Sequence, residues 1–383
     1  GRRSRKPAER KDCIEKTKET KHNEEERKEK SMRKTKKWLA SGLVFVLAMA
    51  LFAGCGKAGE EQGGRQKEQQ EGQKEEQDAG EKKLKAAMIT PQKLGDDGPI
   101  DACYAGLLAG AEEFGYEIKV LEPEAGEYED SIRSMCDDGY NLIFCIFSQM
   151  QDAVSRIAPE YPDVMFVQVL GDLEMDNVKT INYKDQEASF LCGIAAAKMS
   201  KTGKVAVIAG APVGDNVRNI AGFEAGAREA DPDIQVTHLY VGSFEDPTKG
   251  KELANTLLDE GYDMILQVCA SSSMGIREAI KERGENVCMI GNCVDESAAI
   301  PGQVPFSNFS DHKKTVYSTM KEFSEGKFEA GVVNWGLEEG MTKCIFAEDD
   351  VTEVPQEIKD LVAEYEQKII DGTIVPPAEL EGE

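Results

Sequence analysis

From residue 84 onward, short apolar segments alternate with longer amphipathic segments of helical period. Strands are expected over residues 84–90, 117–121, 141–147, 164–169 and 178–182. Helices are expected between and after them, over 101–114, 127–138, 150–160 and 185–200. Such alternation is typical of βαβ units, in which helices cover both faces of a parallel sheet. The sequence therefore predicts an α/β fold.

A second series of the same kind begins at residue 204. Its strands are expected over 204–209, 235–241, 264–268 and 288–291. Its helices are expected over 216–230, 247–260 and 273–283. Asp246 followed by Pro247 is a helix start signal, because Asp is a favoured N-cap and Pro fits the first turn.

The last part of the chain adds elements that we expect to return to the first series. These are a strand over 304–308, a helix over 311–326, a strand over 331–335 and a helix over 355–371. We therefore expect a first lobe of 84–202 plus 303–345, a second lobe of 203–302, and a C-terminal helix and tail of 346–383. In open α/β sheets the ligand lies beyond the carboxyl ends of the strands, so two such lobes predict an interlobe cleft that closes on a ligand.

Residues 32–54 have the pattern of an export signal. Four cations, Arg33, Lys34, Lys36 and Lys37, precede the apolar run 39–53, which is too short to span a bilayer as a mature helix. The run ends in Leu51-Phe52-Ala53-Gly54-Cys55, which resembles a lipobox, so Cys55 is the expected lipidation site, palmitate included. An uncleaved signal anchor remains the alternative.

The segments on either side of the signal are not expected to fold. Residues 1–31 are highly charged, and they are either a non-native upstream extension or a disordered cytoplasmic one. Residues 55–83 hold no aromatic residue and no aliphatic larger than alanine, so they are expected to be a disordered tether. The expected location is the extracytoplasmic face of the cell membrane, reached through the lipid anchor.

Charge and cysteine content narrow the function classes. The chain holds 46 Lys and Arg against 71 Asp and Glu; residues 1–54 take 16 and 8 of these, which leaves 30 against 63, a net charge of −33, for the rest. A body this acidic repels nucleic acid, so no nucleic-acid partner is expected. Most cysteines after Cys55 lie in apolar runs, where mostly free thiols are expected, with disulfides as the alternative.

Two long blocks carry a family resemblance. The block NVKTINYKDQEASFLCGIAAAKMSKTGKVAVIAG and the later block FEAGAREADPDIQVTHLYVGSFEDPTKGKELANTLLDEGYDMILQV resemble the basic membrane protein family. The resemblance covers nearly all of residues 84–345. It implies the two-lobed type I periplasmic-binding-protein fold, three interlobe crossings, a monomer, and a substrate-binding lipoprotein that delivers nucleosides to an ABC transporter permease.

The chain departs from the family at the expected ligand contacts. The position of the family's base-stacking Phe falls on Pro99 or is deleted, and that of its Asn falls on Ile100. The Gly-Val-Asp-Ser-Asp motif, whose first Asp holds ribose hydroxyls, reads Gly291-Asn292-Cys293-Val294-Asp295, and the later Lys falls near Ser310. A Gly-Gly-Thr-Gly-like loop has become 269–275. The resemblance therefore fixes the family better than the ligand.

Candidate ligand residues follow the expected strands. In the first lobe they are Asp96, Asp97, Asp101, Ser148, Gln149 and Asp152. In the second lobe and the returning segment they are Asp215, Asn216, Phe244, Ser271, Ser272, Cys293, Asp295, Asn308 and Trp335. Carboxylates, hydroxyls and amides there suit a hydroxylated or cationic ligand, and the aromatic residues suit stacking. For each residue helix capping, loop formation or core packing is the competing interpretation.

Few residues or motifs in this sequence could support catalysis. After Cys55 only His238 and His312 remain, and no P-loop, Gly-x-Gly-x-x-Gly or His-Glu-x-x-His motif occurs. We expect no cofactor, no metal and no enzymatic activity. The predicted function is capture of a small polar solute, a nucleoside, for an ABC permease. The alternatives are a different solute class, a sensor that docks on a membrane receptor, and a carboxylate-based extracellular hydrolase.

Overall fold

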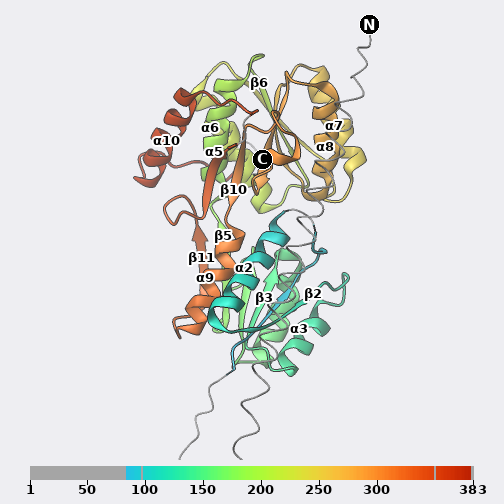
Figure 1. Cartoon of the computed structure of the whole chain (residues 1–383), viewed down its shortest axis with the longest axis vertical. Helices are drawn as coiled ribbons and strands as arrows, with labels where there is room; N and C mark the ends of the chain where they lie inside the picture. Colours follow the sequence, from blue (N-terminus) through green and yellow to red (C-terminus); the bar gives the residue numbers. More distant parts are fainter. Residues whose placement is uncertain (1–82, 96–97, 349–350, 381–383) are drawn as a thin grey trace, which may run out of the picture. The chain divides into compact units, whose positions relative to one another are not determined.

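The computed structural model describes residues 83–95, 98–348 and 351–380, and these residues form two six-stranded sheets (Figure 1). The first sheet has the order β11-β5-β4-β3-β1-β2, and every neighbouring pair in it is parallel. The second has the order β12-β10-β9-β8-β6-β7, and only the pair of β10 and β12 is antiparallel. The predicted α/β fold with two parallel-dominated sheets is confirmed.

The first lobe consists of the first sheet and the helices packed on it. Its strands are β1 (Lys85–Ile89), β2 (Glu117–Leu121), β3 (Leu142–Ile146), β4 (Met165–Val169), β5 (Val178–Tyr183) and β11 (Gly331–Trp335). Its helices are α2 (Pro99–Phe114), α3 (Tyr128–Asp137), α4 (Gln151–Ile157) and α9 (His312–Ser324), with 3-10 turns η1 (Ser148–Met150) and η2 (Ala158–Glu160). Helix α2 packs against α9.

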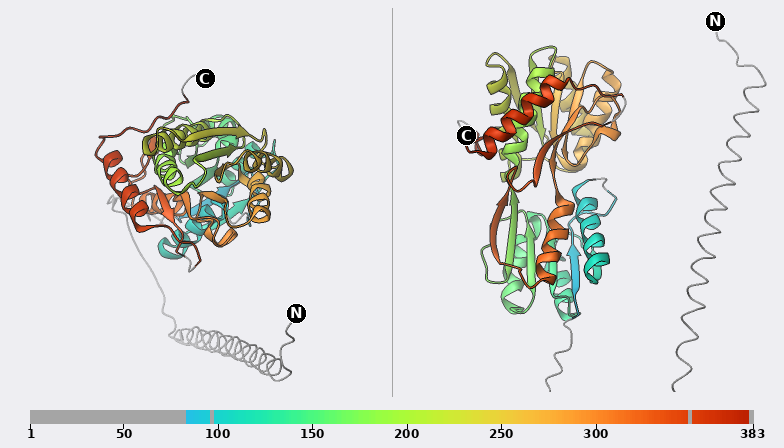
Figure 2. Two further views of the ribbon diagram at one scale, coloured as in Figure 1. Left: turned by 90° about the horizontal axis from the view of Figure 1, so that it is seen from above. Right: turned by 60° about the vertical axis from the view of Figure 1, so that its left-hand side comes forward.

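The second lobe is built in the same way. Its strands are β6 (Lys204–Ala209), β7 (Gln235–Tyr240), β8 (Met264–Val268), β9 (Cys288–Cys293), β10 (Phe306–Ser310) and β12 (Thr342–Phe346). Its helices are α5 (Asp185–Met199), α6 (Gly214–Ala230), α7 (Pro247–Asp259), α8 (Ser273–Arg283) and α10 (Gln356–Ile370), with 3-10 turns η3 (Ala270–Ser272) and η4 (Ser297–Ala299). Helix α10 packs on α5 (Figure 2).

Both faces of each sheet are buried, which explains why the strands read as continuous apolar runs. In β1, Ala86 and Met88 join the cluster under α2 and α9, whereas Ala87 and Ile89 join the cluster under α3 and α4. The second sheet likewise packs on α5, α6 and α10 on one face and on α7 and α8 on the other. Alternate residues of a strand point to opposite faces, so each strand contributes side chains to the apolar clusters on both faces of its sheet.

Helices α5 and α6 approach each other closely because glycines stand where they meet. A Cβ atom on Gly193 would strike the Phe223 carbonyl, and one on Gly226 would strike the Phe190 carbonyl. Helix α5 is buried on nearly every side, because α6, α10 and the sheet surround it. Such a helix is apolar all round rather than amphipathic.

Several predicted details are confirmed and others are wrong. Asp246 caps α7, since its Oδ1 accepts from the Lys249 amide at 2.9 Å. The helix expected over 150–160 is only Gln151–Ile157, flanked by 3-10 turns, because Pro159 has no amide proton to continue the hydrogen-bond series. Strand β12 was not expected at all.

The expected lobe boundaries differ from the observed sheet pairing. Segment 303–345 was assigned to the first lobe, but β10 pairs with β9 and β12 with β10, so both strands belong to the second sheet. Helix α5, assigned to the first lobe within 84–202, packs on α6 instead. The number of crossings agrees with the expectation, because the chain passes between the sheets after β5, after β10 and after β11.

The expected export signal 32–54, Cys55, the upstream segment 1–31 and nearly all of the tether 55–83 lie outside the described residues. Among the helices that the structure describes, none combines the length and hydropathy of a bilayer span. The eight cysteines within the described ranges are all free thiols, and five of them are buried.

Candidate functional site

The topology brings the carboxyl ends of both sheets to the crossings. Each crossing leaves its sheet from the carboxyl end of a strand: β5 and β11 leave the first sheet, and β10 leaves the second. Strands β1, β3, β4 and β5 of the first sheet and β6, β8, β9 and β10 of the second run parallel to one another, so the loops after them lie at the same edge of their sheet as the crossings. The carboxyl edge of an open α/β sheet is where ligands bind.

Backbone strain is concentrated at these same strand ends. Within the described residues, the non-glycine residues with positive φ are Phe147 (72°), Leu170 (63°), Ala270 (46°) and Cys293 (65°). Phe147 and Leu170 follow β3 and β4, while Ala270 follows β8 and Cys293 ends β9. Such conformations cost about 1–3 kcal/mol each and cluster at ligand sites, where the surrounding structure enforces them.

In the first lobe one buried amide holds both strained positions. Gln168 of β4 is fully buried, and its Nε2 donates to the carbonyls of Phe147 and Leu170, both at 2.9 Å. A side chain that bonds two neighbouring loops at once fixes their spacing. Gln168 therefore sets the shape of this edge of the sheet without facing solvent.

The loop after β4 is tied to the first crossing. Asn182 near the end of β5 exchanges two hydrogen bonds with Gly171, accepting from its amide at 3.0 Å and donating to its carbonyl at 2.9 Å. The Gln151 Oε1 accepts from the Asp172 amide at 2.7 Å and leaves no room for a Cβ on Gly171. A movement of the crossing would therefore be transmitted to this loop.

A buried pair of rings lies beneath Phe147. His312, the first residue of α9, has its Nδ1 3.2 Å from the Tyr183 hydroxyl, which is 2.7 Å from the Thr315 hydroxyl. The Phe147 and His312 rings meet edge to face, with centroids 6.4 Å apart. Burial lowers the pKa of His312 to about 4, so its imidazole is neutral at pH 7.

In the second lobe a chain of amides crosses from helix to sheet. Asn308 of β10 donates from Nδ2 to the Asn219 Oδ1 at 2.6 Å and to the Asn292 Oδ1 at 2.9 Å. The Ser189 hydroxyl of α5 also donates to Asn219 at 2.6 Å. This network joins α5, α6, β9 and β10, and through Asn292 it reaches the strained residue Cys293, whose Sγ lies 3.2 Å from the Asn292 Nδ2.

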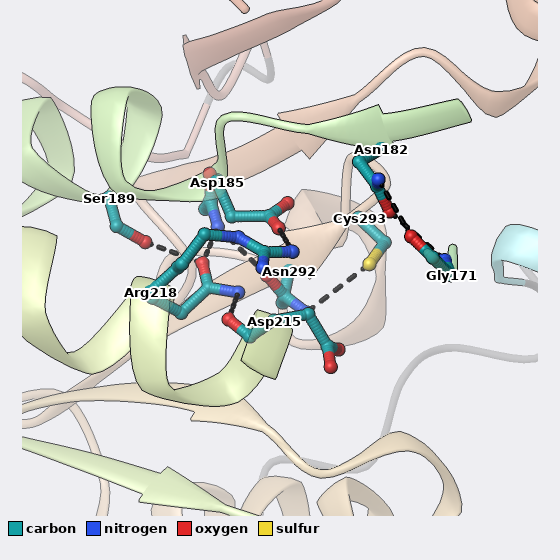
Figure 3. Close-up of polar contacts among 10 residues, drawn as sticks. Gly171, Asn182, Asp185, Ser189, Asp215, Arg218, Asn292 and Cys293 are labelled. Atoms are coloured by element: carbon teal, nitrogen blue, oxygen red, sulfur yellow. Dashed lines mark hydrogen bonds and ion pairs between the residues drawn. The ribbon is translucent and has the colours of Figure 1, made fainter. Parts of the chain in front are cut away.

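An ion pair stands at the first crossing. The Arg218 Nη2 of α6 lies 3.1 Å from the Asp185 Oδ2, in the first turn of α5 (Figure 3). Burial raises the pKa of Asp185 to about 7 despite the opposing effect of Arg218. Burial also raises the pKa of Asp215, which lies in the first turn of α6 beside this pair. A second, partly buried carboxylate therefore lies near the Asp185–Arg218 pair, with its oxygens turned away from it (Figure 3).

The first-lobe candidates that the structure describes lie in the segments that follow β1 and β3. Asp101 accepts from the Gly95 amide at 2.8 Å and so holds its own loop. Ser148, Gln149 and Asp152 are exposed in η1 and the first turn of α4. Asp96, Asp97 and the lipidation candidate Cys55 lie outside the described residues.

Several candidates of the second lobe and the returning segment are turned inward. Asn216 is buried and donates to the Ala211 carbonyl at 2.9 Å, and Asn308 is buried in the amide network. The buried Ser272 hydroxyl donates to the Ser243 carbonyl at 3.1 Å and accepts from the Asp246 amide at 2.9 Å. Trp335 packs in the first lobe, with the Lys179 Nζ 5.7 Å from its ring centroid. These side chains shape the loops rather than present free polar groups.

The remaining candidates are at least partly accessible. The ring of Phe244 covers Gly210, the residue that directly follows β6. Ser271 is exposed in η3. Asp295 is exposed and accepts from the Ser297 amide at 2.9 Å. Asp215 and Cys293 are partly buried. The sequence did not single out Asp185, Arg218, Asn182 or Gln168, because an Asp at a helix start has the pattern of an ordinary cap.

Comparison with known proteins assigns the fold and the family. A family profile described as ABC transporter substrate-binding protein PnrA-like matches residues 83–379. A solute-binding protein of an ABC transporter system from Aeropyrum pernix K1 has the same fold, with a TM-score of 0.69 at 24% identity over 77% of this chain and 94% of that one.

Proteins with names of the same kind are similar to this chain in sequence. The ABC transporter nucleoside-binding protein BmpA of Lactococcus lactis is 32% identical over 273 residues, 66% of this chain and 76% of its own length. A purine-binding protein of Brucella abortus is 30% identical over 258 residues, 66% of this chain and 70% of its own length. Basic membrane protein A1 of Borrelia garinii is 28% identical over 302 residues. This chain is a member of the PnrA-like family of ABC transporter substrate-binding proteins.

Proposed function

We propose that this protein is lipid-anchored at the extracytoplasmic face of the cell membrane, captures a nucleoside between its two lobes, and delivers it to an ABC permease. The main support for the proposal is one observation. The four strand ends with strained backbone lie at the same edges of the sheets as the three crossings between the lobes. A ligand held there would contact loops of both sheets. The crossings would be the hinge of closure.

The loops at this position offer both kinds of contact that a nucleoside needs. Phe147, Leu170 and Phe244 are partly buried apolar side chains suited to enclose a base. Asp215 and the exposed Ser148, Gln149 and Ser271 are polar groups suited to ribose hydroxyls and base edges. Closure would exclude water and so strengthen each of these hydrogen bonds.

The nucleoside assignment rests on the names of the Lactococcus and Brucella relatives, which are a nucleoside-binding and a purine-binding protein. One observation favours a different polar solute. Ile100 stands at the position expected for the family's ligand-binding Asn. It is fully buried in the apolar cluster under α2 and α9 and offers no polar contact. A rebuilt pocket for another hydroxylated or cationic solute is therefore the second candidate.

The remaining parts of the proposal rest on sequence. Residues 32–55 carry the lipoprotein export pattern, so Cys55 is the proposed anchor. A binding protein without a P-loop fits a system in which a separate ATPase drives transport. The proposed absence of catalysis is tested by recovering the nucleoside unchanged after incubation with the protein.

The deciding experiment is a thermal-shift series with adenosine, guanosine, inosine, free bases, ribose, amino acids and polyamines. A ligand at one hundred times its Kd stabilises the folded state by about 2.7 kcal/mol, which raises Tm measurably. A shift with a nucleoside but not with its base or ribose alone supports the proposal. A shift only with another class overturns the nucleoside assignment and supports the second candidate.

A pair of variants locates the site. Asp215→Asn is expected to lower nucleoside affinity about tenfold or more, because a partly buried carboxylate that accepts a ligand hydroxyl is lost. Asp233→Asn, at an exposed aspartate in the turn that follows α6, is the control and should leave the affinity unchanged. Equal affinities for both variants would place the ligand elsewhere.

A further inference from the structure

A buried carboxylate in the second lobe is hydrogen-bonded to the end of β9. Glu296 follows this strand and is only 5% exposed. Its Oε1 pairs with the Arg277 guanidinium of α8. Its Oε2 accepts from the Gln267 Nε2 of β8 at 2.6 Å and from the Asn292 amide of β9 at 3.0 Å. Three donors from three elements therefore converge on one carboxylate.

The segment between Asn292 and Glu296 is a closed turn. The Glu296 amide donates to the Ser307 hydroxyl of β10 at 3.3 Å, and Ser307 is itself buried. A Cβ atom on Gly291 of β9 would strike this hydroxyl and crowd the Glu296 Cβ, so a glycine lets the turn pack against the sheet. The carboxylate then closes the turn, because it bonds back to Asn292 at its start.

The closed turn holds two of the candidate ligand residues. Cys293 is partly buried and has a φ of 65°, and Asp295 is exposed. The Asn292 Nδ2 lies 3.2 Å from the Cys293 Sγ (Figure 3), and the Asn292 Oδ1 accepts from Asn308 at 2.9 Å. A residue other than glycine keeps a positive φ only where its surroundings enforce it. The hydrogen bond from the Asn292 amide to Glu296 is one of these restraints.

The same carboxylate reaches the strained end of β8 through Gln267. The Gln267 Oε1 accepts from the Cys269 amide at 3.4 Å, directly before Ala270, whose φ is 46°. Gln267 therefore connects Glu296 with a second strained strand end. Gln168 connects two such ends in the first lobe, where no carboxylate bonds to it among the described residues.

The three donors explain why residue 296 is a carboxylate. Both oxygens of a carboxylate are acceptors, whereas a glutamine amide has one oxygen and one NH2 group. In Glu296→Gln the NH2 group would therefore face at least one of the three donors. That donor would lose its acceptor within the buried cluster, which weakens the closure of the turn.

We propose that Glu296 is a positioning residue of the ligand site, an inference that rests on the proposed function. Its carboxylate, paired with Arg277, holds the Asn292 amide and so fixes the turn that presents Cys293 and Asp295 to the ligand. Glu296 itself is enclosed by its donors and contacts only these neighbours, so its effect on binding passes through the turn.

The test first follows the turn without a ligand. In the full chain, the rate at which iodoacetamide alkylates Cys293 under native conditions is measured by peptide mapping. Cys288, a partly exposed cysteine at the other end of β9, is the internal reference. Glu296→Gln should raise the Cys293 rate about threefold or more, because the turn opens more often, and should leave the Cys288 rate unchanged.

The second measurement is the affinity for guanosine, followed by titration calorimetry. Glu296→Gln should lower this affinity about tenfold, because the buried hydrogen bonds that hold the turn are incomplete. Glu282→Gln is the matched control, since it changes an exposed glutamate of α8 that pairs with Lys251. It should alter neither the Cys293 rate nor the affinity.

Variants of Arg277 approach the same carboxylate from its partner. Arg277→Lys keeps a cationic donor for Glu296 and should resemble the original protein in both measurements. Arg277→Ala removes the donor and should raise the Cys293 rate. This pair of variants gives an answer even where Glu296→Gln does not fold.

The outcomes separate this proposal from the proposed function. An unchanged Cys293 rate in Glu296→Gln, or an equal acceleration of Cys293 and Cys288, would overturn it, since the turn would not depend specifically on this carboxylate. A faster Cys293 with full guanosine affinity would overturn it too. If the original protein binds no nucleoside, only the proposed function fails. The affinity is then measured with the solute that gives a thermal shift, and its loss in Glu296→Gln supports the positioning role.

Discussion

Asp185 and Arg218 form an ion pair whose carboxylate oxygen and guanidinium nitrogen lie 3.1 Å apart, at the point where the chain first enters the second lobe. The pair is desolvated, and burial raises the pKa of Asp185 to about 7. Because this buried carboxylate has a pKa near neutral, the free energy of unfolding should depend on pH.

Asp185→Asn should change the pH dependence of unfolding. Between the unfolded pKa of about 3.9 and the folded pKa of about 7, the folded protein binds the extra proton, so this residue makes stability fall as pH rises. The slope is at most about 1.4 kcal/mol per pH unit. The variant, measured by denaturant unfolding from pH 4 to 8, should gain stability relative to the original protein up to about pH 7 and then keep a constant difference. Parallel curves would refute the assignment.

His312→Gln should act in the opposite sense. The folded pKa of about 4 lies below the usual 6.5, so the unfolded chain binds the proton first and stability is lost as pH falls from about 6.5 to about 4. The variant should not lose stability in this way as pH falls. At pH 7 it should be less stable than the original protein, because the contact with Tyr183 changes. If His312→Gln lost stability between pH 6.5 and 4 as the original protein does, the imidazole of His312 would not be buried in its neutral form.

Gly226→Ala should destabilise the protein by about 3 kcal/mol, because the added methyl group would strike the Phe190 carbonyl of α5 and force the helices apart. Gly214→Ala lies in the first turn of the same helix, where the nearest atom is the Arg218 Nη1 at 3.4 Å. It should stay within about 0.5 kcal/mol of the original protein. Similar losses for both would mean that helix contact is not the cause.

Gln168→Glu should disturb the strained strand ends. At pH 7 a carboxylate there faces the carbonyl oxygens of Phe147 and Leu170 instead of donating to them, at a cost of about 3 kcal/mol. Gln235→Glu, on an exposed position of β7, should leave stability unchanged. Ligand affinity should fall for the first variant only. A Gln168→Glu protein of full stability and affinity would show that this amide does not hold the site.

The sequence was sufficient for the type of most elements, β12 excepted, but not for their partners. Apolar runs such as 142–146 predict buried strands wherever they pair, because both faces of the sheet are covered. Local pattern cannot decide that 306–310 pairs with β9, since that depends on where the chain turns back. Strand β12 carries Lys343 and pairs antiparallel with β10, so it lies outside the βαβ alternation that marks the other strands.

The candidate site was predictable in position but less so in its members. Strand ends can be read from the alternation, which is why Asp215, Phe244 and Cys293 were singled out. The pairing of Asp185 with Arg218, 33 residues apart, arises only when α5 packs on α6. Likewise, the inward direction of Asn308 and Ser272 depends on hydrogen bonds that no spacing reveals.

The three crossings also set the order in which this protein can be completed during synthesis. Strand β11, at one edge of the first sheet, pairs with β5, so that sheet stays open at this edge until residues 331–335 have left the ribosome. The second sheet waits still longer, for 342–346. Neither lobe can therefore finish folding as a nascent chain until nearly the whole polypeptide has been made. Ribosome-bound chains that end before residue 331 should expose the open edge of β5.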